Sequence, residues 1–187
     1  MTDVSRSSSA LLTTLFQDGQ SAGISAQDLR DLLVSLMPSY GGLYFSTPAA
    51  TTIGSGGTYV KAAGTTTATT ATADVGTGGA SNRLIYTGVV PRHFHVTAAM
   101  TLTPASGTNQ SLGVQVYVYD DSASTGAVVA ASKVNAFDAA TNGTFIATQA
   151  NVTLATDDYV ELWITNETGA VNVTATLGVL FMQGLIV

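Results

Sequence analysis

An all-β fold is predicted for this chain: an antiparallel jelly-roll β-sandwich, preceded by an N-terminal arm that carries one short α-helix. Apolar and polar residues alternate along most of the sequence after residue 41, and this alternation is typical of half-buried strands. Turn-forming Gly, Asn and Asp residues separate about eight such segments. No helical pattern follows Tyr40, so a sandwich or jelly roll is favoured over an α/β fold.

The longest alternating segments are predicted as the main strands: Arg92–Leu102, Leu112–Tyr119, Ile146–Leu154, Tyr159–Thr165 and Val171–Phe181. Shorter strands are predicted at Leu43–Ser46, Thr58–Ala62, Leu84–Thr87 and Val128–Val134. In the last long strand we expect one side to be lined by Val171, Val173, Ala175, Leu177, Val179 and Phe181. The stretch from Thr65 to Ser81 is rich in Thr, Ala and Gly, which predicts a long loop or a weak edge strand.

Residues 1–40 differ in character from residues 41–187, and we treat them as an arm and a sandwich domain. Ser25 is a good helix cap, and Asp28 suits the positive first turn of a helix. Pro38 disfavours helical geometry at the residue before it. The sequence therefore predicts one helix from Ala26 to Met37, with an apolar stripe formed by Leu29, Leu32, Leu33 and Leu36.

The leucine stripe needs a partner surface, because an isolated helix of this length is marginal in water. The sandwich, a sister subunit and the surface of a larger particle are the three candidates. We expect the arm to anchor the protein to a particle, and packing on its own domain is the alternative. The predicted anchoring residues are Leu11, Leu12, Leu15, Phe16, Leu29, Leu32, Leu33 and Leu36.

Charge is scarce in this sequence. Only 10% of the residues are charged, against roughly a quarter in an average soluble domain, so we expect a surface that is partly covered by other chains. The net charge is −6 and no basic cluster exists, which argues against nucleic acid as a partner. There is no cysteine, no visible signal peptide and no apolar run near the ~20 residues of a membrane span.

Opposite the predicted core positions, the strands carry aromatic and histidine side chains where Lys, Glu, Thr and Ser are usual. Tyr and Trp are enriched at protein interfaces, so this side is predicted to be buried in a homotrimer. Scattered, merely amphipathic aromatic residues are the alternative. The aliphatic C-terminal segment, residues 180–187, is likewise expected in an oligomer contact. The predicted interface residues are His93, His95, Gln115, Tyr117, Tyr119, Tyr159 and Trp163, with Glu161 as the one carboxylate among them.

The sequence offers little support for chemistry. His93 and His95 could ligate a metal, but no further histidine exists, and interfacial packing is the preferred interpretation. The pairs Asp120-Asp121 and Asp157-Asp158 lack the ligand spacing of a known calcium loop, so turn formation is expected. No nucleophile elbow or phosphate-binding loop occurs. We therefore expect no enzyme activity, no metal and no cofactor.

Two parts of the chain resemble a known group of proteins. The segment from Thr14 to Leu36 resembles one common in tailed-phage virion proteins. The segments Arg92-His93-Phe94-His95-Val96 and Asp157-Asp158-Tyr159-Val160-Glu161-Leu162 resemble their trimeric jelly-roll heads, which are similar to the tumour-necrosis-factor and C1q fold. The resemblance implies a trimer that projects from, or cements, a phage particle assembled in the bacterial cytoplasm.

Three functions remain open at this point. No coiled-coil or collagen-like stalk is visible, which favours a capsid decoration (cement) protein bound to the major capsid protein. A tail-fibre or receptor-binding head that recognises host surface glycan is the main alternative. A spike that degrades polysaccharide is the third.

Overall fold

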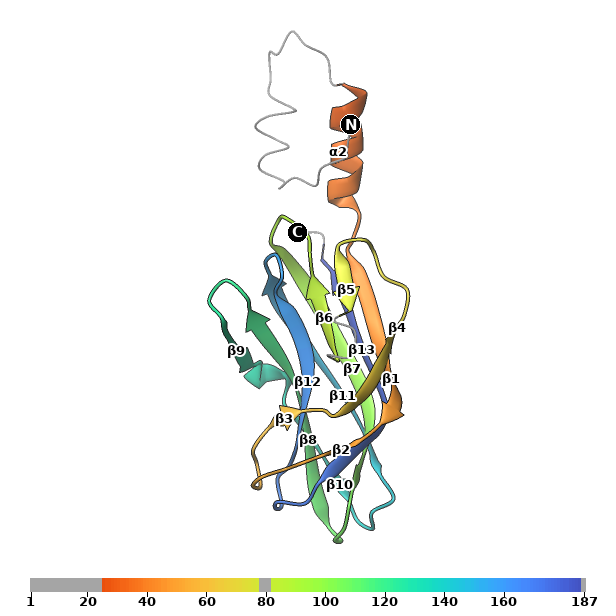
Figure 1. Cartoon of the computed structure of the whole chain (residues 1–187), viewed down its shortest axis with the longest axis vertical. Coiled ribbons are helices and arrows are strands. Elements are labelled where there is room, and N and C mark those ends of the chain that lie inside the picture. Colours follow the sequence, from red (N-terminus) through yellow and green to blue (C-terminus); the bar gives the residue numbers. More distant parts are fainter. Residues whose placement is uncertain (1–24, 78–81, 186–187) are drawn as a thin grey trace.

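The computed structural model describes residues 25–77 and 82–185 (Figure 1). Helix α2 (Ala26–Leu36) begins as its sequence predicts. The Ser25 hydroxyl accepts a hydrogen bond from the backbone N–H of Asp28 at 3.1 Å, and Asp28 accepts one from the N–H of Ser25 at 2.9 Å. These two bonds satisfy two of the free donors at the helix start. The helix ends one residue before the predicted Met37, ahead of Pro38.

The strands form two antiparallel sheets that pack face to face, so the predicted antiparallel jelly-roll sandwich is confirmed (Figure 1). Sheet A has the order β11-β7-β13-β1-β4, with β2 paired to β13. Its strands are β1 (Tyr40–Pro48), β2 (Ala50–Thr51), β4 (Gly64–Ala68), β7 (Arg92–Pro104), β11 (Thr144–Leu154) and β13 (Val173–Gly184).

Sheet B has the order β10-β8-β12-β6-β5, with β3 paired to β12 and β9 paired to β8. Its strands are β3 (Val60–Lys61), β5 (Val75–Thr77), β6 (Arg83–Tyr86), β8 (Gln110–Asp120), β9 (Thr125–Val128), β10 (Val134–Asp138) and β12 (Tyr159–Asn166). The predicted strand at Val128–Val134 is wrong in its extent, because a short 3-10 helix, η3 (Ala130–Ser132), separates β9 from β10. The Thr-rich stretch contributes the edge strands β4 and β5, as the weak-edge interpretation predicted.

The core lies between the sheets and takes every second residue of the long strands. Phe94 and Val96 of β7 are completely buried, and Leu162 and Ile164 of β12 are at most 2% exposed. Phe94 also meets the ring of Tyr86 edge-on, with 5.0 Å between the ring centroids. Aromatic pairs of this geometry contribute about 0.5–1.5 kcal/mol beyond the area that they bury.

Strand β13 contradicts one prediction about the core. Its first half points Val173 and Ala175 inward, but its second half points Leu180 and Met182 inward and Leu177 outward. The cause is a shift in register with β7 between Ala175 and Leu177. An extra residue on one strand moves every later side chain to the opposite face. Three residues predicted for the core side, Leu177, Val179 and Phe181, therefore lie on the outer surface.

Candidate functional site: the outer face of sheet A

The outer face of sheet A is divided into a polar end and an apolar end. Strand pairing places His95 of β7 between Asn151 of β11 and Gln183 of β13. Further along the strands, Ala99 of β7 lies between Ala147 and Val179. The polar end is the one next to helix α2, since β7 starts there with Arg92 bonded to the end of the helix.

Large apolar side chains stand exposed at the other end of this face. Leu177 is 70% exposed and Phe145 is 68% exposed, and the remaining members are about half covered. We name this surface the sheet A patch and define it by Tyr44, Phe145, Leu177, Val179 and Phe181. Scattered exposed leucines are ordinary, but large apolar residues on one face of neighbouring strands mark an interaction site.

The sheet A patch is shaped as well as apolar. Phe181 pairs with Gly42, where a side-chain carbon would come within 3.0 Å of the phenyl ring, so the glycine leaves room for the ring to lie over β1. Beside it runs a groove of about 580 Å³, lined on the sheet by small residues such as Ala99 and Ala147 and at its end by Val134. Protruding rings beside a shallow groove allow one copy to insert side chains into another.

The two histidines lie at the polar end of the same face. The Nδ1 atom of His95 is 2.8 Å from Oδ1 of Asn151, and Nδ1 of His93 is 2.9 Å from the hydroxyl of Thr153. Both rings are thus held by the neighbouring strand β11, with Nε2 as their other polar atom. Their predicted place in a subunit interface stays a prediction, and it is consistent with their position beside the patch.

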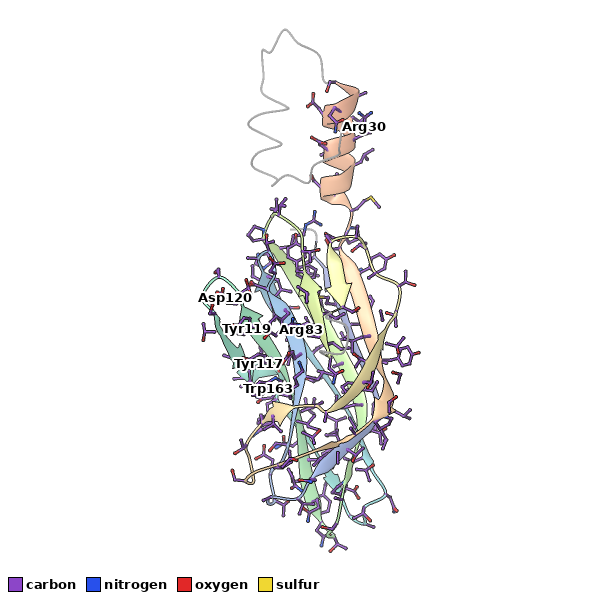
Figure 2. The ribbon with its side chains drawn as sticks, in the orientation of Figure 1. Arg30, Arg83, Tyr117, Tyr119, Asp120 and Trp163 are labelled. Atoms are coloured by element: carbon purple, nitrogen blue, oxygen red, sulfur yellow. The ribbon has the colours of Figure 1, made fainter. Side chains whose placement is uncertain are left out.

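The other predicted interface residues belong to strands β8 and β12 of sheet B. Figure 2 shows Tyr117, Tyr119 and Trp163 together there, whereas Gln115 is buried, with 5% of its surface exposed. Strand β7 belongs to sheet A, whereas β8 and β12 belong to sheet B. The prediction that all seven share one face is therefore wrong. Period-two alternation shows which side chains point away from the core, but it does not show which sheet a strand joins. The sheet B group is Gln115, Tyr117, Tyr119, Tyr159 and Trp163.

The aromatic rings of sheet B cover one another. Tyr117 stacks on Trp163 with 4.1 Å between ring centroids, and Tyr119 stacks on Tyr159 with 4.6 Å. The Arg83 guanidinium lies 4.4 Å from the centre of the Tyr159 ring. Desolvation raises the pKa of both Tyr117 and Tyr159, which agrees with their half-buried state. Much of their apolar surface is hidden within one chain.

Glu161 is the buried carboxylate beneath these rings, with 5% of its surface exposed. Nζ of Lys61 lies 2.5 Å from Oε1 of Glu161, and the indole N–H of Trp163 donates to Oε2 at 3.1 Å. Both carboxylate oxygens are satisfied, so the group is part of the packing of this face. An interface at the sheet B rings stays a prediction, and their burial does not require one.

The predicted anchoring residues fall into two sets. Leu11, Leu12, Leu15 and Phe16 lie outside the described residues. On α2, Leu32 is half-buried, while Leu29, Leu33 and Leu36 are 52%, 55% and 48% exposed. The alternative prediction is that the leucine stripe packs on the sandwich of its own chain. It is wrong for these three leucines, because about half of each side chain is exposed. Anchoring to a particle stays a prediction.

The acidic pairs serve turns in the described structure. Asp158 accepts hydrogen bonds from the backbone N–H groups of Asp121 and Ala155 at 2.9 and 2.8 Å. The Ser122 hydroxyl and the Ala123 N–H hydrogen-bond to Asp120 and lower the pKa of its carboxyl. Among residues 25–77 and 82–185 no group of three or more His, Asp or Glu side chains could hold a metal ion.

Helix α2 does not qualify as a membrane span, and neither does any other helix in the described part of the chain, since none is both long enough and apolar enough.

Solved structures of the tumour-necrosis-factor type superpose on most of this chain. Murine APRIL at pH 5.0 superposes with a TM-score of 0.55 at 7% identity, covering 80% of this chain and 100% of that one. The tumour-necrosis-factor protein Eiger from S. frugiperda has a TM-score of 0.52 at 7% identity, covering 80% of this chain and 94% of that one. The sandwich is a tumour-necrosis-factor-like jelly roll. At such low identity the likeness concerns the fold alone.

The globular domain of zebrafish complement 1qA also matches, with a TM-score of 0.44 at 12% identity, covering 80% of this chain and 98% of that one. No family model matches the sequence, and no curated protein sequence matches it.

Sequence reasoning missed Tyr44 and Phe145 as surface residues and assigned Leu177, Val179 and Phe181 to the wrong side. For Phe145 a signal existed, because it alternates with Ile146 and the apolar residues after it. The outward direction of Tyr44 could also be predicted from alternation, because it stands between Leu43 and Phe45, which are both buried. No comparable signal marks the β13 residues, since their side depends on the register with β7.

Proposed function

We propose that this protein is a non-catalytic structural module that assembles into a homotrimer through the outer face of sheet A. The observation that carries the proposal is the sheet A patch, with Leu177 and Phe145 each about two-thirds exposed. An open surface of this kind on a free chain would aggregate, and burial against sister subunits removes that cost. The low charge of the sequence is in keeping with a largely covered surface.

The shape of the patch favours a closed ring over a simple two-fold dimer. Phe145 protrudes from the edge strand β11, and the groove beside Ala99 and Ala147 lies next to it on the same face. A projection of one copy that enters a groove of the next makes a contact between unlike surfaces. Contacts of this kind close into a ring when the rotation between copies allows it, and three copies form the smallest ring.

We place this trimer on the surface of a phage particle, as a capsid decoration protein that contacts the major capsid protein through the N-terminal arm. Support comes from the resemblance of Thr14 to Leu36 to virion proteins and from helix α2, which lies beyond one end of the sandwich (Figure 1). A decoration protein stabilises a shell by burying apolar surface across its subunit boundaries. Standard protein contacts bury on the order of 1,200–2,000 Å² each, and many copies multiply the effect.

One observation favours the second candidate, a receptor-binding head. In a trimer built on sheet A the sheet B rings face outward, and Figure 2 shows Tyr117, Tyr119 and Trp163 together with Arg83 on that side. Aromatic rings beside polar groups suit contact with sugars, whose faces are apolar and whose hydroxyls form hydrogen bonds.

The assembly is tested by the mass of the purified chain in solution. Light scattering is expected to give three times the chain mass of 19.0 kDa, and Leu177→Glu is expected to give a monomer. Thr125→Glu, on the exposed strand β9 of sheet B, is the matched control and is expected to leave the mass unchanged. A stable wild-type monomer at micromolar concentration contradicts the proposal.

The two locations are separated by copy number. Densitometry of purified virions against the major capsid protein is expected to show hundreds of copies of a decoration protein, and a few dozen at most of a tail head. A glycan array on the trimer supports the receptor-binding head if specific sugars bind and Trp163→Ala abolishes the binding.

A further inference from the structure

Among its described side chains, helix α2 presents an open apolar stripe along one side. Leu29, Leu33 and Leu36 are each about half exposed, whereas Asp31, on the far side of the helix, is 1% exposed. Met37, directly after the helix, is 62% exposed and extends the stripe toward the sandwich. The uncovered side of the helix is therefore its apolar side, the reverse of what a free helix in water presents.

The spacing of the stripe is that of a helix bundle. Leu29, Leu33 and Leu36 are separated by four and then three residues, and Ala26 precedes Leu29 by three. This alternation of three and four places all of them along one seam of a helix, as at the a and d positions of a coiled coil. Leu32 and Met37 flank the seam, and a wider apolar stripe of this kind suits a bundle.

The helix has a fixed direction relative to the sandwich. The Arg92 guanidinium, at the start of β7, donates hydrogen bonds to the carbonyl oxygens of Ser35 at 3.2 Å and Met37 at 2.8 Å. A cation at the end of a helix satisfies free carbonyls and complements the helix dipole. Figure 1 shows α2 beyond one end of the sandwich, leading into β1 of sheet A.

The stripe is also continuous in the chain with the proposed association surface. Only residues 37–39 separate α2 from β1, and β1 carries Tyr44 of the sheet A patch. Sister copies joined through sheet A and related by rotation about an axis along the sandwich would carry their helices from the same end, in the same direction. Parallel helices with apolar seams at equal heights are then brought together.

We propose that the seam of α2, formed by Ala26, Leu29, Leu33 and Leu36, packs against the same seam of the other copies as a short parallel helix bundle. This inference rests on the proposed homotrimer. An 11-residue helix buries too little to associate alone, but assembly of the sandwiches raises the effective concentration of the helices and removes most of the cost of bringing them together. Attachment to the particle then falls to the earlier part of the arm.

Cysteine cross-linking tests the bundle, because the natural chain contains no cysteine. Leu33→Cys places a thiol in the seam at an exposed site, so folding is expected to be unaffected. Mild oxidation, or a short bismaleimide, is expected to link two of the three chains of each trimer, so that a denaturing gel shows covalent dimers beside the unlinked third chain. Ser35→Cys, nearly isosteric and on the far side of the same helix, is the matched control and is expected to stay monomeric on that gel.

Light scattering and cross-linking together test the helix bundle separately from the homotrimer on which it rests. If light scattering shows the wild-type and Leu33→Cys proteins to be trimers but position 33 cross-links no more than position 35, the bundle is wrong and the trimer stands. In that case, cross-linking of Leu33→Cys to the capsid protein in virions would assign the leucines to the particle. If the wild-type chain is a monomer, both ideas fail.

Discussion

Leu177 of β13 lies opposite Thr101 of β7, although Ala175, two residues earlier, lies opposite Leu102, the very next residue along β7. Strand β13 thus advances by two residues where its partner advances by one. This single irregularity turns the second half of β13 over, so that Leu180 and Met182 enter the core while Leu177, Val179 and Phe181 face outward. The sheet A patch exists because of it.

Val179 and Leu180, which follow the register shift in β13, are expected to stabilise different things: Leu180 the fold of the single chain, and Val179 the association of chains. Leu180 is 1% exposed, so Leu180→Ala should lower the free energy of unfolding by about 2–5 kcal/mol through lost contacts and a cavity. Val179 is 48% exposed, so Val179→Ala should change the unfolding of a single chain by less than about 0.5 kcal/mol and weaken association instead. Denaturant titrations at several protein concentrations measure both effects. Equal losses in the two variants would place both residues in the core.

Arg92 is expected to control the order of α2. Replacing it with methionine keeps much of the apolar stem and removes the donors to Ser35 and Met37. Hydrogen bonds from a charged donor contribute about 1.5–3 kcal/mol, so amide exchange in the helix should accelerate by about 10- to 100-fold. Hydrogen exchange with mass spectrometry measures this on the peptide that contains residues 29–37.

Arg30→Met is the control for Arg92. The Arg30 guanidinium bonds to the side chain of Gln27 and lies away from the end of the helix, so its loss should leave exchange in the last turn nearly unchanged. Equal acceleration in the two variants would show that Arg92 does not hold the helix end.

The start of the helix and the side of each long strand could largely be predicted from sequence, because both depend on neighbouring residues. Ser25 and Asp28 form the expected cap, and Phe94 and Val96 point inward as alternation requires. What could not be predicted depends on partners far along the chain. The side of Leu177 is decided by its register with β7, and the separation of His93 from Tyr117 is decided by which sheet each strand joins.

Asp138 is expected to make stability depend on pH at the acid end. It is 4% exposed; burial acts to raise the pKa of its carboxyl, but backbone hydrogen bonds, including those from Ala140 and Gly143 at 3.0 and 2.9 Å, lower it overall. A carboxyl whose pKa is lower in the folded than in the unfolded state stabilises the fold above the unfolded value. That contribution is lost as the pH falls from about 4 through the folded pKa.

Asp138→Asn removes this titration and keeps the shape of the side chain. We expect the variant to be less stable than wild type near neutral pH by about 1–3 kcal/mol, since an amide offers one acceptor oxygen where the loop uses two. The difference should shrink as the pH falls through the folded pKa, which lies below the unfolded value, because the wild-type carboxyl then becomes protonated as well. Unfolding titrations across this pH range measure it, and a difference that stays constant with pH would contradict the assignment.

The sheet A patch and the sheet B rings are the two candidate interfaces, and substitutions on each distinguish them. If sheet A forms the interface, Trp163→Ala should leave the mass in solution unchanged, because Trp163 stacks on Tyr117 of its own chain and lies on the other sheet. The free energy of unfolding of this variant should still fall, by up to about 5 kcal/mol. The substitution removes a large ring and the indole N–H that donates to buried Glu161. Phe145→Ala, on sheet A, should lower the mass without much loss of stability, because its ring is 68% exposed. Light scattering and thermal unfolding of both variants give the answer: a trimer that survives Phe145→Ala and dissociates with Trp163→Ala would transfer the interface to sheet B.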